Sequence, residues 1–433
     1  MEVKALRLEL GKIYVKDIQF GAETKVENGV LFVNKEELLK EVSGDERLKS
    51  IDFDIARPGD ETRIIPVKDV IEPRVKVQGS GGIFPGFVSK VDTVGSGKTN
   101  VLKGTAVVTT GKVVGFQEGI IDMSGEGAKY CPFSKTNNLV ITCEPADGVK
   151  QHEHEEALRM VGFKAAAYLG EAGRDVTPDE VKVYETLPLL EQVKQYPDLP
   201  KVIYVYMLQT QGLLHDTYVY GVDAKKIIPT FIYPTEVFDG AIVSGNCVSA
   251  CDKNPSYVHM NHPVIEDLYE NHGKEYNFLG CVITNENVYL ADKERSSNMT
   301  AKLVKFLGAD AVIITEEGFG NPDADLVMNC NKITDMGIKT VLITDEYAGQ
   351  DGASQSLADA TQKGDAVVTS GNANEVIILP AMKKVIGHPE AANIIAGGHV
   401  GSLRKDGSIE VEIQVITGVN SEVGFFTLSS KGY

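Results

Sequence analysis

The sequence predicts an α/β protein: a β-rich N-terminal region followed by an α/β region with a mostly parallel sheet covered by helices. In the first third of the chain, short alternating or β-branched runs are separated by Gly and Pro clusters, as in strands joined by turns. From residue 201 onward, apolar strands alternate with polar loops and helices, which favours a parallel sheet. A chain of 433 residues is expected to form two or three domains.

The first expected domain, residues 1–147, is β-rich. We predict strands where β-branched residues concentrate, at residues 64–70, 87–94, 105–110 and 139–143. The segment GSGGIFPG at residues 79–86 contains too much Gly and Pro for regular structure, so it is predicted to be a loop.

A helical connecting region is expected at residues 148–200. Residues 151–170 place Ala and Leu at helical spacing, and Gly170 is a suitable end for this helix. A stretch rich in Pro and charge, residues 177–200, then leads into the third expected domain.

The α/β domain is expected to span residues 201–433. Predicted helices lie near residues 297–307 and 324–336, and predicted strands cover residues 202–207, 276–284, 311–315, 340–344, 366–369 and 375–379. Parallel sheets bind ligands beyond the carboxyl ends of their strands. We therefore expect the functional site at the loops 316–321, 345–352 and 370–374.

The charge balance argues against two classes of partner. The formal net charge is −18 and no run rich in Lys or Arg occurs, so neither nucleic acid nor a membrane is expected as a partner. The first 20 residues lack the apolar core of a secretory signal, and no uncharged apolar run is long enough to cross a bilayer. Together with six irregularly spaced cysteines, these features predict a cytoplasmic protein.

Two short motifs suggest ligand sites but have simpler interpretations. GSGKT at residues 95–99 has Asp92 where a phosphate-binding loop needs its first glycine, so a hairpin turn is predicted. His152 and His154 are two residues apart on the predicted helix and point in different directions, which favours a charged, solvated first turn. No metal site is predicted.

Cys247 and Cys251 lie in the segment VSGNCVSAC. Their spacing fits neither a CxxC redox motif nor, by itself, a zinc site, and a buried structural role is common for cysteine. The small residues around Asn246 and Cys247 would also permit a tight turn in which the Cys247 thiol attacks the preceding carbonyl. The residues alone leave both interpretations open.

Long runs of the sequence resemble one known family. The runs are residues 66–77 (PVKDVIEPRVKV), 111–123 (GKVVGFQEGIIDM), 209–251 (QTQGLLHDTYVYGVDAKKIIPTFIYPTEVFDGAIVSGNCVSAC), 285–297 (NENVYLADKERSS), 313–322 (IITEEGFGNP) and 344–358 (TDEYAGQDGASQSLA). They resemble the family of glycine reductase component B, whose members are precursors of α and β subunits.

The resemblance implies a cut between Asn246 and Cys247, giving a β chain of residues 1–246 and an α chain of residues 247–433. It implies that Cys247 becomes a pyruvoyl group, the cofactor, which binds glycine as a Schiff base. The expected enzyme is an oxidoreductase that deaminates glycine reductively. The selenolate of the component A selenoprotein attacks the bound glycine, component C yields acetyl phosphate, and thioredoxin is the ultimate reductant. A selenocysteine-containing γ subunit is a further expected partner.

Four more residues are candidates within this framework. Arg295 is expected in a polar loop after a strand, where it would bind the glycine carboxylate. Glu316, Glu317 and His215 follow predicted strands and are candidates for proton transfers while the Schiff base forms. For His215, a place in a loop that caps the next element is an equally good interpretation.

Three alternatives remain. A sarcosine reductase component B would use the same scaffold, and the pyruvoyl subunit of proline reductase would share the cysteine-derived ketone. A non-catalytic α/β protein that binds a small molecule would not be cleaved at all.

Overall fold

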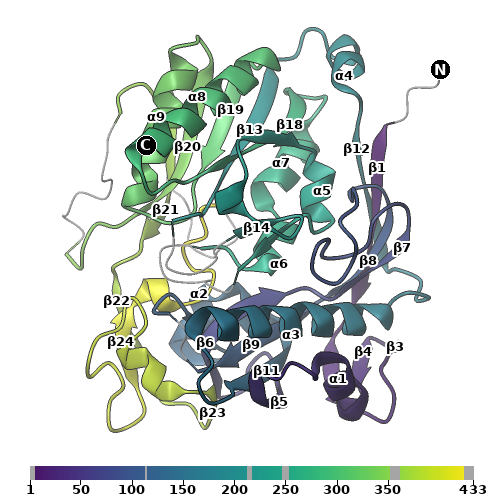
Figure 1. The fold of residues 1–433 in the computed structure, drawn as a ribbon, viewed down its shortest axis with the longest axis vertical. Coiled ribbons are helices and arrows are strands. Elements are labelled where there is room, and N and C mark those ends of the chain that lie inside the picture. The colour runs from purple at the N-terminus through teal and green to yellow at the C-terminus, as the bar shows by residue number, and fades with distance from the viewer. Residues whose placement is uncertain (1–4, 113–114, 212–216, 246–252, 352–360, 424–433) are drawn as a thin grey trace.

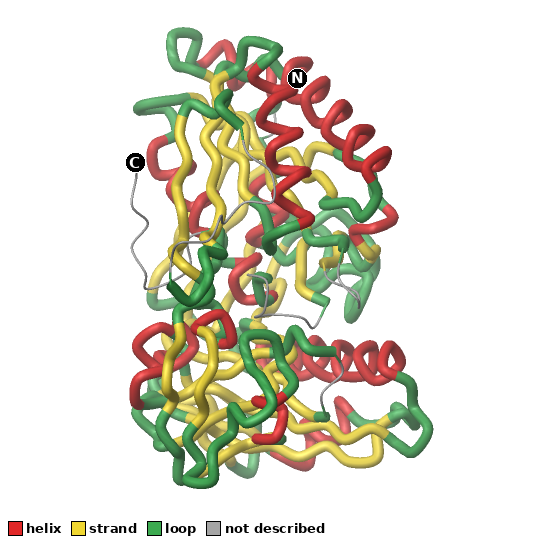
Figure 2. The backbone as a smooth tube through the Cα atoms, turned by 90° about the vertical axis from the view of Figure 1, so that its left-hand side faces the viewer, coloured by secondary structure: helices red, strands yellow, loops and turns green. Residues whose placement is uncertain are grey.

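The computed structural model describes residues 5–112, 115–211, 217–245, 253–351 and 361–423 of the chain. The strands fall into two main groups, each flanked by helices (Figure 1; Figure 2). The lower group in Figure 1 comes mainly from the N-terminal half of the chain and the upper group mainly from the C-terminal half. The predicted fold class, a β-rich region followed by an α/β region, is confirmed.

The N-terminal half forms two mixed sheets, with the orders β12-β1-β8-β7 and β10-β6-β9-β11-β5. All residues of β6 and β9 are buried, so these two strands form the centre of the second sheet. The strands are β1 (Leu6–Tyr14), β5 (Leu48–Ala56), β6 (Thr62–Ile71), β7 (Arg74–Gln78), β8 (Gly97–Lys103), β9 (Thr105–Gly111), β10 (Gly119–Asp122), β11 (Asn137–Pro145) and β12 (Glu180–Thr186).

Three of the four strands predicted in this half are present, as β6, β9 and β11. The strand predicted at residues 87–94 is wrong, because these residues form a turn and loop. Its apolar residues serve packing instead of strand alternation: the ring of Phe87 lies 4.8 Å from that of Phe163. The loop at residues 79–86 is confirmed. The hairpin turn predicted for GSGKT is wrong, because residues 95–96 end a long connection between the antiparallel strands β7 and β8, and residues 97–99 already belong to β8.

The helix predicted at residues 151–170 is α3 (Gln151–Glu171), which crosses both N-terminal sheets (Figure 1). Gly170 permits close packing more than it ends the helix, since a Cβ there would lie 2.0 Å from the Arg74 backbone oxygen. The prediction of a charged, solvated first turn is wrong in part. His154 and Glu155 are buried, and Glu155 pairs with Arg159 at 2.8 Å. Against α3 packs α1 (Lys35–Val42), beside a small sheet of β2 (Asp17–Phe20), β3 (Lys25–Glu27) and β4 (Val30–Val33).

The C-terminal half is built on a six-stranded sheet with the order β16-β18-β13-β19-β20-β21. Only the pairing of β16 with β18 is antiparallel, so the prediction of a mostly parallel sheet is confirmed. The strands are β13 (Lys201–Leu208), β16 (Thr230–Ile232), β18 (Asn277–Asn285), β19 (Ala311–Thr315), β20 (Lys339–Glu346) and β21 (Ala366–Asn372).

Alternation along β13 explains how both faces of this sheet are covered. Ile203, Val205 and Met207 share a hydrophobic cluster with residues of α8 (Leu290–Phe306) and α9 (Asn321–Thr334). Tyr204 and Tyr206 point to the opposite face, where the chain places α5 (Pro234–Phe238), α6 (Ser256–Met260) and α7 (Pro263–Asn271). This second face carries the polar side chains described below.

Two predictions in this half need correction. The strand predicted at residues 375–379 is β22 (Val376–Leu379), which lies outside the parallel sheet and pairs antiparallel with β24 (Ile409–Glu412). Val376 and Ile378 are about half exposed, as expected for a surface ribbon. The helix predicted near residues 297–307 begins seven residues earlier, at Leu290.

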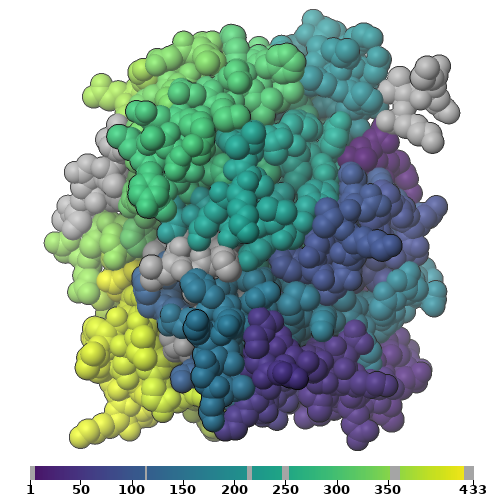
Figure 3. Space-filling view, viewed as in Figure 1, coloured from purple at the N-terminus to yellow at the C-terminus, as the bar shows by residue number. Residues whose placement is uncertain are grey.

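The chain returns to the N-terminal half after the parallel sheet. β23 (Lys384–Gly387) pairs in parallel with β6, and the yellow C-terminal residues lie beside blue N-terminal ones in Figure 3. β12 likewise pairs with β1, so sheet pairing crosses both proposed domain boundaries. The division at residues 147 and 200 stays a prediction. Among the helices that the structure describes, none combines the length and apolar character needed to cross a membrane.

The remaining elements connect these parts. They are α2 (Gly125–Tyr130), α4 (Leu189–Gln195) and a three-stranded sheet in the order β15 (Val222–Asp223), β14 (Thr217–Val219) and β17 (Ile242–Ser244). β17 leads directly toward the segment 246–252, and α6 begins shortly after it. These two elements therefore fix the two ends of the segment that contains the expected cleavage site.

Candidate functional site

Buried acidic residues follow the parallel strands at their carboxyl ends. Glu286 comes directly after β18, and Glu316 and Glu317 come directly after β19. Asp345 is the second-to-last residue of β20. Each of these four residues is at most 1% exposed. Because parallel strands end at the same edge of their sheet, residues far apart in the sequence meet here. The predicted site location, including the loops at residues 316 and 345, carries this acidic edge.

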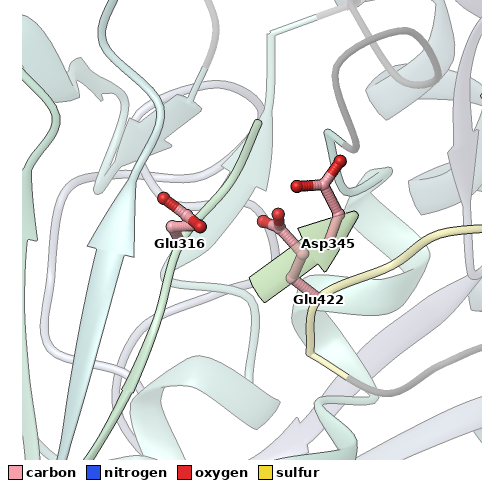
Figure 4. Close-up of side chains that lie close together, drawn as sticks. All are labelled: Glu316, Asp345 and Glu422. Carbon is pink, nitrogen blue, oxygen red and sulfur yellow. The ribbon is translucent and has the colours of Figure 1, made fainter. Parts of the chain in front are cut away.

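Two of these carboxyl groups and a third, that of Glu422, come from separate segments and point toward one another. Oxygens of Glu316, Asp345 and Glu422 all lie within 4.8 Å of one another (Figure 4). Burial, and then the charge of Asp323, raise the pKa of Glu316 well above its usual value. Such a group of oxygens suits a hard cation or a positively charged nitrogen, since either would offset the cost of burying several carboxylates.

Glu286 extends the acidic edge toward β18. Its Oε1 accepts a hydrogen bond from the backbone N–H of Glu317 at 2.7 Å. Its Oε2 is buried and has no hydrogen-bond partner among the described residues. Burial, and then the Glu317 charge, raise the pKa of Glu286 well above its usual value. Burial and the neighbouring charge therefore both favour the protonated form of Glu286.

Both carboxylate oxygens of Glu317 accept hydrogen bonds. Its Oε2 accepts hydrogen bonds from the Gln209 backbone N–H (3.0 Å) and the Thr217 hydroxyl (3.1 Å). Its Oε1 accepts two from Asn254, from the backbone N–H (3.1 Å) and from Nδ2 (3.2 Å). One carboxylate thus ties together β19, the end of β13, the start of β14 and the residue that precedes α6 by two.

Two tyrosine–histidine pairs lie beneath this edge. The Tyr204 hydroxyl contacts Nε2 of His262 at 3.0 Å, and also the hydroxyl of Thr315. The Tyr206 hydroxyl contacts Nδ1 of His259, whose Nε2 lies 3.5 Å from Glu317. All of these side chains are fully buried. Burial lowers the pKa of both histidines and keeps them neutral at rest.

The residues on either side of segment 246–252 are held by buried carboxylates. On the N-terminal side, the Ser244 backbone N–H donates to the Ser256 hydroxyl at 3.0 Å, and that hydroxyl donates to Asp69 at 2.6 Å. On the C-terminal side, Asn254 donates to Glu317, and its Oδ1 accepts from the Ser421 hydroxyl at 2.7 Å. Burial raises the pKa of Asp69 to about 7.

The expected reactive residues themselves lie outside the described residues. These are Asn246 and Cys247 at the expected cut, Cys251, and His215. On either side of the segment 212–216, which contains His215, Thr217 and the earlier residue Gln209 both donate to Glu317. The two glutamates predicted for proton transfer, by contrast, are both found at the acidic edge.

The expectation that Arg295 lies in a polar loop is wrong. It lies within α8, with 56% of its side chain exposed, and it pairs with Asp292 one turn earlier. The buried cation of this helix is Lys293, whose Nζ contacts the Asp325 carboxylate and donates to the Asn321 carbonyl at 2.8 Å. The role of Arg295 in carboxylate binding stays a prediction, and its position on the helix surface gives it no support.

Several residues of the site were missed in the sequence. Glu286 follows a predicted strand, as Glu316 does, so the same rule applied to every strand would have found it. Asp345 belongs to the predicted loop at residues 345–352, but the structure extends β20 to Glu346, so Asp345 lies in the strand. Glu422 and His259 gave no comparable signal, because only the return of the chain and the packing of α6 bring them to this edge.

Comparisons with known proteins identify the family. Residues 6–431 match the family described as glycine/sarcosine/betaine reductase component B subunits. The chain is 74% identical to "Glycine reductase complex component B subunits alpha and beta" of Acetoanaerobium sticklandii and 70% identical to the protein of the same name from Peptoclostridium acidaminophilum. It is 60% identical to "Sarcosine reductase complex component B subunit alpha" of Peptoclostridium acidaminophilum. Each alignment covers 99% of this chain and 100% of the relative.

No solved structure matches this chain significantly. The family match, in contrast, spans almost the whole sequence, and it agrees with the resemblance found in the six long runs. The chain belongs to the family of glycine/sarcosine/betaine reductase component B subunits.

Proposed function

We propose that this chain is the substrate-binding proprotein of a glycine reductase component B. It is cut between Asn246 and Cys247, and Cys247 becomes the pyruvoyl group. When present, this ketone captures the amino group of glycine as a Schiff base. The relatives that carry the name "subunits alpha and beta" support one chain giving two subunits, because this chain aligns with their full length.

The observation that carries the proposal is the anchoring on both sides of segment 246–252. Ser244 is tied through Ser256 to Asp69 of the N-terminal half, and Asn254 is tied to Glu317 at the sheet edge. An intramolecular attack gains from such anchoring, because holding reacting groups together replaces an encounter in solution. A mere surface loop would not need buried carboxylates at both ends.

The side chains at the acidic edge suit a binding site for an amine. Glu286 and Glu316 each have a buried oxygen without a hydrogen-bond partner among the residues that the structure describes, and both lie at an edge rich in carboxyl groups. A positively charged nitrogen of the substrate would be stabilised there. The raised pKa values of Glu286 and Glu316 allow these residues to hold protons at Oε2 and to release them when such a charge approaches.

The proposed reaction requires partners beyond this chain. The selenolate of the component A selenoprotein attacks the bound glycine, component C forms acetyl phosphate, and thioredoxin supplies the reducing equivalents. A selenocysteine-containing γ subunit completes component B. The printed names of the relatives, which speak of a reductase complex and of component B, support an assembly of several proteins.

The protein isolated from its native cell tests this function. We expect two fragments on denaturing electrophoresis, with masses that match residues 1–246 and 247–433, the second blocked to N-terminal sequencing. Cys247→Ala should leave one intact chain, whereas Cys251→Ala, the matched control, should be cut as in the wild type. An intact native chain with a free thiol at Cys247 would show that the proposal is wrong.

Substrate choice is tested by trapping. Borohydride reduction in the presence of labelled glycine should attach the label to the smaller fragment. The fragment should gain the mass of glycine less one oxygen atom, because condensation releases water and reduction adds two hydrogens. Labelled sarcosine and D-proline should be trapped less. The higher identity to the glycine reductase proteins than to the sarcosine reductase protein, 74% against 60%, favours glycine. Preferential trapping of sarcosine would assign the chain to the other branch of the family.

A further inference from the structure

His259 combines full burial with an open nitrogen at the acidic edge. Its Nδ1 contacts the hydroxyl of Tyr206. Its Nε2 has no hydrogen-bond partner among the residues that the structure describes. The nearest acidic oxygen, Oε1 of Glu317, lies 3.5 Å from Nε2 and already accepts two hydrogen bonds from Asn254. In the tautomer whose Nδ1–H donates to the Tyr206 hydroxyl, Nε2 carries the free lone pair of the ring and can accept a proton.

The surroundings of His259 suit a proton that is taken up and released. The groups that face the ring are the Tyr206 hydroxyl, the Glu317 carboxylate, the backbone of Asn254 and the neighbouring imidazole of His262. Burial lowers the pKa of His259, while Glu317 and the Asn254 backbone oppose this shift. The ring is neutral at rest, and the adjacent carboxylate stabilises the imidazolium once a proton arrives.

His262 provides a contrast within the same network. It is equally buried, but its Nε2 is bound to Tyr204 at 3.0 Å and its Nδ1 accepts from the Ile265 backbone N–H at 3.5 Å. Both nitrogens are thus occupied by partners that cap α7 and anchor it to β13. His262 has a structural position, and the open nitrogen distinguishes His259 from it.

We propose that His259 is the proton-transfer residue for the amino group of the substrate, oriented by Tyr206 and charge-stabilised by Glu317. This inference rests on the proposed function, in which an amino acid enters with an ammonium group. The ammonium N–H bond breaks and an N–H bond to Nε2 forms, while the electron pair stays on the substrate nitrogen and makes it nucleophilic. The reverse transfer restores the neutral imidazole.

A titration tests this assignment without turnover. In the uncut Cys247→Ala chain with isotope-labelled histidine, the His259 imidazole should titrate, and Glu317→Gln should lower its pKa because the stabilising charge is gone. The His262 signal should stay at its neutral position over the same pH range. A His259 pKa that does not respond to Glu317→Gln overturns the proposed pair.

Trapping then tests the role itself in the complete component B. His259→Asn retains an amide near the Nδ1 position for Tyr206 and removes Nε2, and His262→Gln is the matched control. We expect both variants to be cut at residue 246. Borohydride trapping of labelled glycine should slow by about 100-fold or more in His259→Asn, with loss of its pH dependence, and should remain near the wild-type rate in His262→Gln.

The outcomes separate this inference from the function beneath it. A wild-type chain that is never cut would reject the proposed function. A His259→Asn chain that is cut and traps glycine at the wild-type rate, with an unchanged pH profile, would reject only the role of His259. A His259→Asn chain that remains uncut while retaining the wild-type melting temperature would also reject this role and would place the residue in chain cleavage. His259→Gln, which offers an amide at the Nε2 position, provides a second variant for the same readouts.

Discussion

Asn254 gives two hydrogen bonds to a single oxygen of Glu317, one from its backbone N–H at 3.1 Å and one from its side chain at 3.2 Å. The second carboxylate oxygen accepts from Gln209 and Thr217. Glu317 therefore joins segments that are more than 60 residues away from it in the chain. Because Glu317 directly follows β19, its hydrogen bonds hold Asn254, on the C-terminal side of segment 246–252, against the edge of the sheet.

Glu317→Gln should destabilise the fold and slow the proposed cleavage. The amide nitrogen would face donors where an oxygen now accepts, and each buried donor left unpaired costs about 1–3 kcal/mol. We expect a loss of roughly 2–4 kcal/mol in the free energy of unfolding, measured by urea denaturation of the uncut Cys247→Ala chain. Glu294→Gln on the exposed surface of α8 is the control and should change stability by less than about 0.5 kcal/mol.

Asp69 should give the fold a pH dependence of defined sign. Its pKa is about 7 in the folded protein, against roughly 3.9 in an unfolded chain, so the folded state binds more protons between these values. This contribution to stability is largest below about pH 4, falls as the pH rises toward 7, and is constant above it. When urea unfolding is measured at several pH values, the free energy of unfolding should therefore fall less steeply with rising pH for Asp69→Asn than for the wild type.

The matched control is Asp406→Asn, since Asp406 is exposed and its pKa is lowered by hydrogen bonds from Ser408. This variant should keep the wild-type decline between pH 4 and 7. Identical pH profiles for wild type and Asp69→Asn would show that Asp69 has an ordinary pKa in the folded protein.

A cut at residue 246 should not separate the two fragments. β13 of the first fragment pairs with β18 on one side and with β19 on the other, and both of these strands belong to the second fragment. β23 of the second fragment pairs in turn with β6 of the first. Size-exclusion chromatography of the cut protein should show one species, which separates only in denaturant. Separation in native buffer would contradict this topology.

Substitution of Arg63, which forms a buried ion pair, should reduce stability more than substitution of Arg404, which forms an exposed one. Its guanidinium makes two hydrogen bonds to buried Asp122, at 2.6 and 2.8 Å, and donates to the Pro380 carbonyl of the returning chain at 2.9 Å. Arg63→Ala leaves an uncompensated buried carboxylate and should cost about 3–5 kcal/mol. Arg404→Ala breaks an exposed pair with Glu410 and should cost less than about 1 kcal/mol. Similar losses in thermal or urea unfolding would contradict the argument from burial.

Much of the fold was predictable because local pattern and burial agree. Residues 311–315 and the helix at 151–170 have periods that match their final structures, so they were located within one residue. The strand expected at residues 87–94 failed because its apolar residues pack against α3 from a loop. Arg295 was misplaced for a related reason: polar residues on the outer face of α8 resemble a loop when the buried face is not known.

The sequence by itself determined the family, the parallel sheet, and Glu316 and Glu317 at its carboxyl edge, because long runs and strand periodicity are local properties. Only the tertiary structure decided that Glu422, Asp345 and Glu286 gather around them and that His259 retains an open nitrogen. These relations depend on which strands are neighbours and on how the chain returns to the N-terminal half. Hydrogen bonds and charges act over a few ångströms in space, and distance along the chain does not reveal them.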